Sequence, residues 1–176
     1  MKVIFVRHGQ TNYNLQSLCN DDPTVNVYLT ELGQQQAQIV AAQLKTVPIE
    51  RIIVSELPRT YQTAIIINQY HGVKIEVRSA LNDIRSGFEG QAVHKYFAAI
   101  AHDVLNAKAN NGESFMDYKR RVETFLTWLK QQTETVILVV AHEETMRIFK
   151  GYFHQIADEN LRQMRFENCA VLEVEF

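Results

Sequence analysis

Three short, unbroken runs of apolar residues constrain this chain most. They cover residues 3–6, 51–54 (after a leading arginine) and 136–140, and they are rich in valine and isoleucine. Such runs are typical of strands that are buried on both faces, as in parallel sheets. Two alternating segments predict further strands, a weaker one at 73–77 and a terminal one at 170–176. The terminal one has polar residues on one side, which favours a place near a sheet edge.

Helical periods lie between these strands. Apolar residues recur at three- and four-residue spacing after Thr30, a good N-cap, and a second helix is expected from Pro58 to about Gly72. A third apolar stripe runs from 93 to 104, and a fourth helix follows the pair Ser114 and Asp117, which resembles a capping box. Alternating strands and helices predict one α/β domain over 1–176. We expect a three-layer α/β/α sandwich with a mostly parallel central sheet and a C-terminal edge strand.

Composition narrows the class of protein. The 176 residues are 46% hydrophobic and 22% charged with a net charge of −2, so no overall field recruits nucleic acid or an anionic membrane. The longest aliphatic stretch, 136–141, is too short to span a bilayer, and Arg7 interrupts the first apolar run, unlike a secretory signal. The two cysteines, Cys19 and Cys169, are far apart and predict free thiols in a reducing compartment. We therefore expect a cytoplasmic protein.

Polar residues capable of chemistry follow the predicted strands. Arg7-His8-Gly9 follows the first strand, Arg59 lies soon after the second, Asp83 after the third, and His142 after the fourth. In open α/β sheets, ligands bind outside the carboxyl ends of the strands. Segments that are remote in sequence are therefore predicted to meet at one edge of the sheet.

These side chains together suit a phosphate ester. The planar fork of arginine matches phosphate oxygens, and the helix expected after His142 begins with free backbone N–H groups. A neutral histidine can attack phosphorus, and a carboxylic acid can protonate a departing alkoxide. Each residue alone has a commoner structural explanation, such as a surface charge or a turn, so the prediction depends on their joint placement. The other four histidines are expected at the surface.

At these residues the sequence resembles the histidine phosphatase superfamily, the phosphoglycerate-mutase-like proteins. The resemblance is carried in order along the chain by Arg7-His8-Gly9-Gln10-Thr11-x-x-Asn14, Leu29-Thr30-x-x-Gly33-x-x-Gln36-Ala37, Ser55-x-x-x-Arg59-x-x-Gln62-Thr63-Ala64, Gly87-Phe88-Glu89-Gly90, Gly112-Glu113-Ser114 and Val139-Val140-Ala141-His142. It implies a phosphatase in which His8 is the nucleophile.

The resemblance also implies roles for the remaining residues. The phosphoryl group would be bound by Arg7, Asn14, Arg59 and His142, with the backbone N–H of Glu143 available to it. The proton donor, usually a glutamate, corresponds here to Asp83, one methylene shorter. The family usually has small residues after the last histidine, where this chain has Glu143-Glu144. We expect both glutamate side chains to point away from the phosphate.

The predicted activity is hydrolysis of small phosphate monoesters, such as a sugar phosphate or nucleotide, through a phosphohistidine on His8. No cofactor is expected and no metal-ligand spacing is visible, since the helix after His142 lacks the second histidine of a zinc motif. Segment 92–108, with Tyr96 and Phe97, is expected to cover the pocket. Three alternatives stay open: a phosphoglycerate-mutase-type phosphoryl transfer, a metal-dependent hydrolase, and a non-catalytic phosphate-binding or interaction protein.

Overall fold

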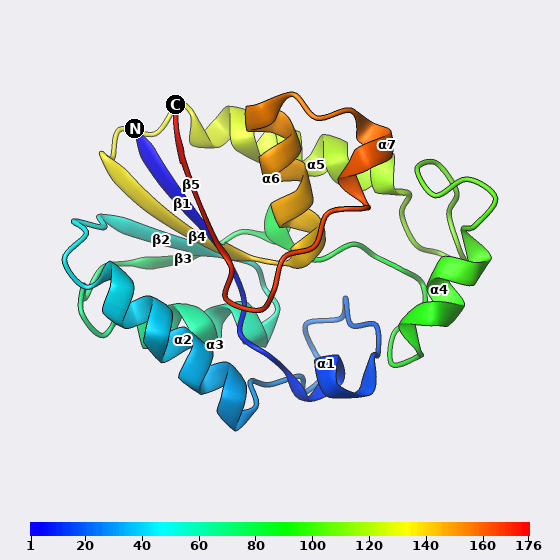
Figure 1. Ribbon diagram of the computed structural model, residues 1–176, viewed down its shortest axis with the longest axis horizontal. Helices are drawn as coiled ribbons and strands as arrows, with labels where there is room; N and C mark the ends of the chain where they lie inside the picture. The colour runs from blue at the N-terminus through cyan, green and yellow to red at the C-terminus, as the bar shows by residue number, and fades with distance from the viewer.

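The computed structural model describes residues 1–176 and contains a five-stranded sheet in the order β3-β2-β4-β1-β5. The strands β1 (Lys2–Arg7), β2 (Arg51–Val54), β3 (Ile75–Val77) and β4 (Val136–Ala141) are parallel to one another. The last strand, β5 (Val171–Glu175), pairs antiparallel with β1 and forms an edge of the sheet. The mostly parallel sheet and the C-terminal edge strand are therefore confirmed (Figure 1).

Helices cover both faces of this sheet, which confirms the three layers (Figure 1). The helices α2 (Glu31–Leu44) and α3 (Pro58–Asn68) lie on one face, and α5 (Phe115–Leu129), α6 (Glu143–His154) and α7 (Asp158–Leu161) lie on the other. Successive side chains of a strand point to opposite faces. Ile4 and Val6 accordingly pack in the core under α2 and α3, whereas Val3 and Phe5 pack in the core under α5 and α6.

The capping residues in the sequence predicted where helices begin more accurately than where they end. Thr30 caps α2, since its Oγ1 accepts a hydrogen bond from Gly33 N at 3.0 Å, and Ser114 and Asp117 form the predicted capping box of α5. The predicted extension of α3 to Gly72 is wrong, because α3 ends at Asn68. The Asn68 side chain bonds both the N–H and the C=O of Val73, at 2.9 Å each, and this turns the chain toward β3.

The predicted long helix at 93–104 is also shorter in the structure. It is α4 (Val93–Ala99), followed by turns. Asp103 Oδ1 accepts hydrogen bonds from the N–H groups of Leu105 and Asn106, so its side chain competes with continued helix. Ile100 is buried all the same, whereas Ala101 and Val104 are exposed.

Beyond the carboxyl ends of the strands lie α1 (Asn12–Gln16) and α4, with a single 3₁₀ turn at Ser79–Leu81 after β3 (Figure 1). A small apolar cluster of Cys19, Tyr96, Ile100 and Ala109 holds this end together, separate from the two cores that pack against the sheet. None of the helices combines the length and the apolar character that a membrane span requires.

Candidate active site

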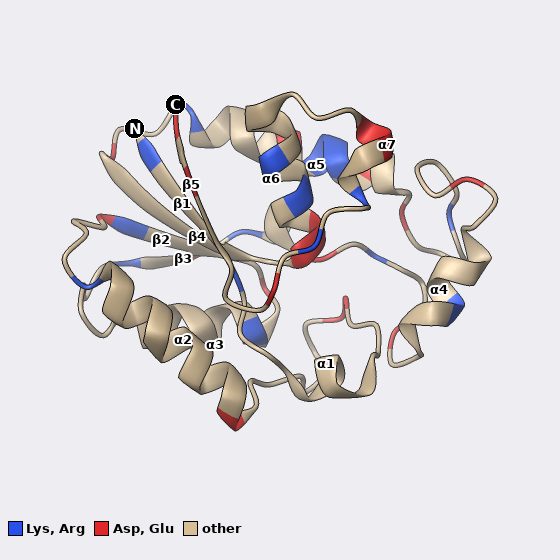
Figure 2. Ribbon diagram, viewed as in Figure 1, with Lys and Arg blue, Asp and Glu red and all other residues tan.

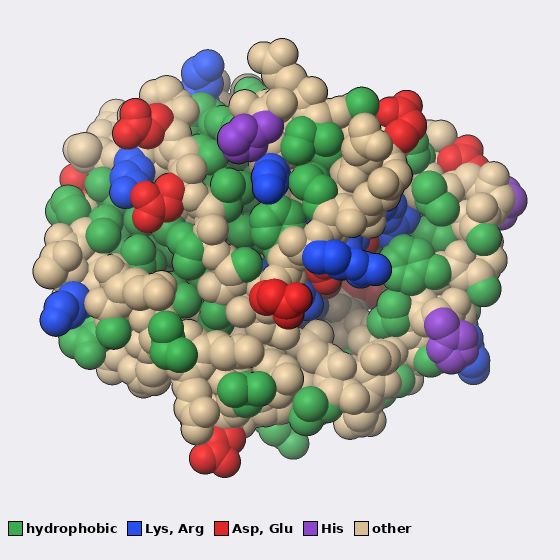
Figure 3. Space-filling view, in the orientation of Figure 1, with side chains coloured by type: hydrophobic (Ala, Val, Ile, Leu, Met, Phe, Trp, Pro, Cys, Tyr) green, Lys and Arg blue, Asp and Glu red, His purple; other side chains and the backbone are tan.

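A pocket opens at the carboxyl ends of the strands, between α1, α4 and the beginning of α6. Figure 3 shows it as a hollow with basic and acidic side chains at its edge. Six of the residues that sequence analysis selected line this pocket, and they are Arg7, His8, Asn14, Arg59, Asp83 and Glu143. The seventh, His142, is fully buried, and its ring centroid lies 5.4 Å from that of His8. The structure therefore brings all seven predicted residues together.

His8 lies just past the end of β1 and is 3% exposed. Its Nδ1 is 2.7 Å from the carbonyl oxygen of Gly9, which can only accept, so Nδ1 carries the proton and Nε2 carries the lone pair. Arg59 Nε donates to that Nε2 at 3.1 Å. Burial, followed by the charges of Arg59 and Arg7, holds the pKa of His8 well below its usual value. The ring is therefore a neutral imidazole whose lone pair lies on Nε2.

Gly9 allows the turn after His8 to pack directly on α2. A Cβ atom at Gly9 would lie 2.4 Å from the carbonyl oxygen of Gly33, so only glycine permits this contact. The Gly9 N–H donates to Thr63 Oγ1 of α3 at 3.1 Å. Backbone contacts to two helices thus fix the position of the neighbouring His8.

Arg59, the second residue of α3, spreads its guanidinium across the floor of the pocket and is 4% exposed. Besides His8, it contacts Asp83 Oδ2 and the carbonyl oxygen of Asn20 through Nη2, both at 3.1 Å, and it donates through Nη1 to Asn20 Oδ1. Asn20 is a residue that the sequence did not point to. It lies in a loop with no pattern that would single it out, yet it orients the arginine beside His8.

The guanidinium group of Arg7, the last residue of β1, has one paired edge and one unpaired edge. Its Nη1 donates to the carbonyl oxygen of Phe166 and lies 3.3 Å from Glu143 Oε2. Its Nε is buried without a hydrogen-bond partner. Buried donors are normally paired, so the Nε edge is the part of Arg7 that is left for a ligand.

His142 is the N-cap residue of α6 and follows β4 directly. Its Nε2 is 3.0 Å from Ser55 Oγ, and its buried Nδ1 has no hydrogen-bond partner and lies 3.6 Å from Asp83 Oδ2. Burial and the nearby charge of Arg59 hold the pKa of His142 well below its usual value. Ser55 had been recognised only as part of a motif, and the structure shows that its hydroxyl orients this ring.

Asp83 is carried by a loop that two other side chains pin down. Arg121 donates to the carbonyl oxygens of Ala80 and Asn82 at 2.8 and 2.9 Å, and Glu113 accepts from the N–H of Arg85 at 3.1 Å. Burial raises the pKa of Asp83 to about 6, although the charge of Arg59 acts in the opposite direction. A carboxyl group with such a pKa is protonated in a useful fraction of molecules near neutral pH.

The side chains of Asn14 and Glu89 both accept hydrogen bonds that hold backbone segments near the pocket in place. Asn14 Oδ1 accepts the N–H of Thr11 at 2.9 Å in the capping box of α1, so its amide NH₂ is the end left for a ligand. Glu89 accepts hydrogen bonds from Asn20 Nδ2 and from the N–H groups of Asp21 and Asp22, at 2.7 to 3.0 Å. Glu89 therefore anchors the loop that carries Asn20.

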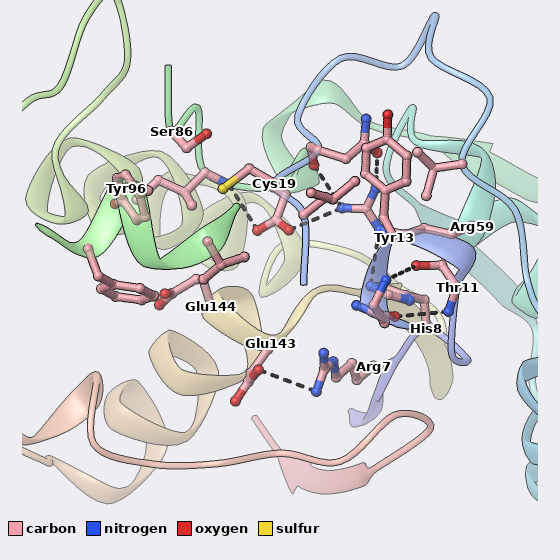
Figure 4. A pocket seen from close by; sticks show the side chains of 18 of the residues that line it. Arg7, His8, Thr11, Tyr13, Cys19, Arg59, Ser86, Tyr96, Glu143 and Glu144 are labelled. Carbon is pink, nitrogen blue, oxygen red and sulfur yellow. Dashed lines mark hydrogen bonds and ion pairs between the residues drawn. The ribbon is translucent and has the colours of Figure 1, made fainter. Parts of the chain in front are cut away.

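The expectation that Glu143 and Glu144 point away from the site is wrong, since both line the pocket (Figure 4). Glu143 lies between Arg7 and Arg147, 2.8 Å from the latter, and Glu144 lies between Arg147 and Arg162, at 2.8 and 3.0 Å. These arginines supply the countercharges that allow two carboxylates to remain there. Figure 2 shows the acidic beginning of α6 and the basic positions that follow it.

No three His, Cys, Asp or Glu side chains form a group that could hold a metal ion. The cations of the pocket are arginines, and its two buried imidazoles are held neutral.

Comparison with known proteins agrees with this geometry. The chain matches the histidine phosphatase superfamily (branch 1) over residues 3–176. It belongs to that family.

One relative is the adenosylcobalamin/alpha-ribazole phosphatase of Salmonella typhimurium, which is 30% identical over 158 residues that cover 84% of this chain and 77% of the relative. Among solved structures, the alpha-ribazole phosphatase of Shigella flexneri has a TM-score of 0.89 at 23% identity, covering 99% of this chain and 90% of that one. The phosphoserine phosphatase of Entamoeba histolytica has a TM-score of 0.82 at 22% identity, covering 98% and 89%. The two structures share the fold, and the family with its phosphatase relatives supports a phosphoric monoester hydrolase.

Proposed function

We propose that this protein hydrolyses small phosphate monoesters through a phosphohistidine on Nε2 of His8. The observation that carries the proposal is the protonation pattern of His8. The Gly9 carbonyl holds the proton on Nδ1, and burial keeps the ring neutral, so the lone pair lies on Nε2, inside an arginine-lined pocket.

In the first step, Nε2 of His8 forms a bond to phosphorus and the bond to the ester oxygen breaks. The leaving oxygen takes the proton of Asp83, whose pKa of about 6 leaves part of the population protonated. Asp83 contacts Arg59 in the structure, and the incoming phosphoryl group would bind that arginine in its place. The Nδ1–H of His8 keeps its bond to Gly9 and stabilises the charge that forms on the ring.

In the second step, Asp83 accepts a proton from water as that water attacks phosphorus, and the bond to Nε2 breaks. Inorganic phosphate leaves, and His8 returns to its neutral form. Charge on the equatorial oxygens is held throughout by fixed donors, so catalysis comes mainly from positioning and electrostatics. These donors are Arg7, Asn14, Arg59, His142 and the backbone N–H of Glu143.

The unpaired Nδ1 of His142 fits this role as a donor. With the Ser55 hydroxyl donating to Nε2 across 3.0 Å, the ring proton lies on Nδ1, the buried atom that has no hydrogen-bond partner. A phosphate oxygen would satisfy it.

The leaving group would lie against Val93, Tyr96 and Phe97, the residues of α4 that line the pocket. These apolar and aromatic side chains suit a small ester such as a sugar phosphate or nucleotide. We also propose a cytoplasmic location, which the buried, unpaired Cys19 and Cys169 support. Imaging of a tagged chain tests that location, and residence in an oxidising compartment would contradict it.

Trapping the intermediate tests the mechanism. After brief incubation with a ³²P-labelled monoester and a rapid quench, label should be found on His8, labile to acid and stable to base. His154→Ala, which removes an exposed histidine at the end of α6, should label normally, whereas His8→Ala should not. Label on a serine or aspartate would overturn the proposal.

Two measurements on the same reaction separate the alternatives. A phosphatase releases inorganic phosphate in proportion to substrate consumed, whereas a mutase moves the phosphoryl group to another hydroxyl. Turnover should also continue in EDTA, because protein donors bind the phosphoryl group. Loss of turnover with chelator and recovery with zinc or magnesium would favour a metal-dependent hydrolase.

A further inference from the structure

Glu143 contacts one of the arginines assigned to the phosphoryl group. We propose that Glu143 is a resident anion of the phosphate site, which shares Arg7 with the bound phosphoryl group and so limits how tightly phosphate is held. This inference rests on the proposed function, and it adds a residue that determines affinity for the substrate and for the phosphate product.

The ion pair lies in a partly buried place. Glu143 Oε2 is 3.3 Å from Arg7 Nη1, and the two side chains are 22% and 14% exposed. Charges in such surroundings are screened much less than charges in water. A phosphoryl dianion at the free Nε edge of Arg7 would therefore experience the negative charge of Glu143 at close range.

Glu143 is held so that it cannot easily swing away when phosphate arrives. Its Oε1 accepts a hydrogen bond from Arg147 Nη2 at 2.8 Å and another from the N–H of Phe166 at 3.4 Å. Arg147 is itself fixed, since its Nε donates to the carbonyl oxygen of Met164 at 2.9 Å. The carboxylate is thus part of the built site, in contrast to a flexible surface charge.

The charges that face Arg7 come from several elements. Burial lowers the pKa of Arg7, whereas the charges of Glu143, of Asp83 and, from the C-terminal loop, of Glu167 raise it, and the charge of Arg147 lowers it. Each of the two arginines assigned to the phosphoryl group has a carboxylate partner, Glu143 on Arg7 and Asp83 on Arg59. Asp83 loses its charge when it carries the proton for catalysis, but Glu143 has no such step. Its charge therefore opposes phosphate binding throughout the cycle.

The neighbouring glutamate supplies a matched control. Glu144 has the same charge and lies in the same helical turn, but its carboxylate pairs with Arg147 and Arg162 and not with Arg7. Glu143→Gln and Glu144→Gln therefore remove one negative charge each from adjacent positions, and only the first removes it from Arg7.

Titration calorimetry with inorganic phosphate at pH 8 tests the inference without requiring turnover. Glu143→Gln should bind phosphate about tenfold more tightly than the wild type, because one charge close to a dianion is removed. Glu143→Ala should also gain affinity, and Glu144→Gln should change it by less than about threefold, since its charge lies farther from Arg7 and is shared by two arginines. In steady state, phosphate should inhibit Glu143→Gln more strongly than the wild type.

Unchanged or weaker phosphate binding by Glu143→Gln would overturn the inference and would make Glu143 a residue that merely orients Arg7. An equal gain in Glu144→Gln would also overturn it, because the effect would then be a general field. Failure of the proposed function would give a different result. The wild type would not turn over a monoester, and Arg59→Gln would bind phosphate as tightly as the wild type does.

Discussion

Two regions meet at the pocket, and they are built in different ways. The floor consists of Arg7, His8, Arg59 and His142. Arg7 ends β1, His8 and His142 directly follow β1 and β4, and Arg59 lies in the first turn of α3 after β2. The cover consists of residues 17–28 and 86–109, which are loops and turns around the seven-residue helix α4. The sheet dictates where the floor residues lie, whereas individual side-chain contacts dictate where the cover lies.

The contacts of the cover show this dependence. Glu89 holds the first loop through three hydrogen bonds, and Arg162 reaches from beyond α7 to the carbonyl oxygen of Val104 and the hydroxyl of Tyr96, at 2.8 and 3.3 Å. The apolar cluster beneath the cover has four buried residues, against nineteen and fifteen in the cores on the two faces of the sheet. We therefore expect the floor to determine the reaction and the cover to determine which ester reacts.

The most severe test of this division is His8→Ala. If His8 is the nucleophile, as proposed, this variant should lower kcat by about 10⁴-fold or more, because the remaining donors would still bind phosphate but nothing would attack it. Phosphate affinity, measured by calorimetry, should change far less than kcat. Near-normal turnover by the variant would place the chemistry elsewhere in the pocket.

Asp83 lies between the two regions, in a loop after β3 that is pinned to α5 by Arg121. Asp83→Asn keeps its shape but cannot act as an acid, so single-turnover rates on alkyl phosphates should fall by about 10²–10⁴-fold. Nitrophenyl phosphate expels a weakly basic phenolate, so the single-turnover rate of Asp83→Asn on this substrate should fall much less. Equal losses on both substrates would mean that Asp83 only shapes its loop.

The pH dependence of kcat/KM tests the same group, Asp83, with a smaller expected effect. Burial holds the pKa of His8 well below its usual value, so under the proposed mechanism the pH dependence near neutral pH comes from the protonation of Asp83. The pKa of Asp83 is raised to about 6, and kcat/KM should therefore fall above that pH, about tenfold per unit. The substrate phosphate titrates in the same range, so the profile of Asp83→Asn is the control. If kcat/KM of Asp83→Asn falls equally steeply with pH, the titrating group is the substrate phosphate.

The difference between the regions also explains what the sequence could predict. The apolar runs at 3–6, 51–54 and 136–140 locate strands, and parallel strands bring the residues that follow them to one edge, so the floor could be predicted without the structure. The capping residues Thr30 and Ser114 gave the beginnings of helices correctly for the same local reason.

Residues held by distant side chains could not be located in this way. Besides their pairs with Arg147 inside α6, Glu143 lies beside Arg7 at the end of β1, and Glu144 lies beside Arg162, eighteen positions further along in a segment without a pattern. Asn20 contacts Arg59 only because Glu89 fixes its loop. Long-range ion pairs and loop anchors leave no periodic trace in the sequence, so the orientation of the glutamates and the role of Asn20 appear only in the fold.

The smallest predicted effect belongs to the cover and concerns Phe97, which lines the pocket and is 38% exposed. Phe97→Ala removes part of an apolar wall that a leaving group would contact but the phosphoryl group would not. Partial burial of one aromatic ring contributes about 1 kcal/mol, so KM for a nucleotide or aryl phosphate should rise about fivefold.

The selectivity of that effect matters more than its size. The affinity for inorganic phosphate, which has no leaving group, should stay unchanged in Phe97→Ala, and so should the single-turnover rate at saturating substrate. Tyr152→Ala, which removes an exposed aromatic side chain of α6 outside the pocket, should change neither constant. If Phe97→Ala instead lowers phosphate affinity as strongly as it raises KM, the cover helps to build the phosphate site. The separation between a floor that reacts and a cover that selects would then be wrong.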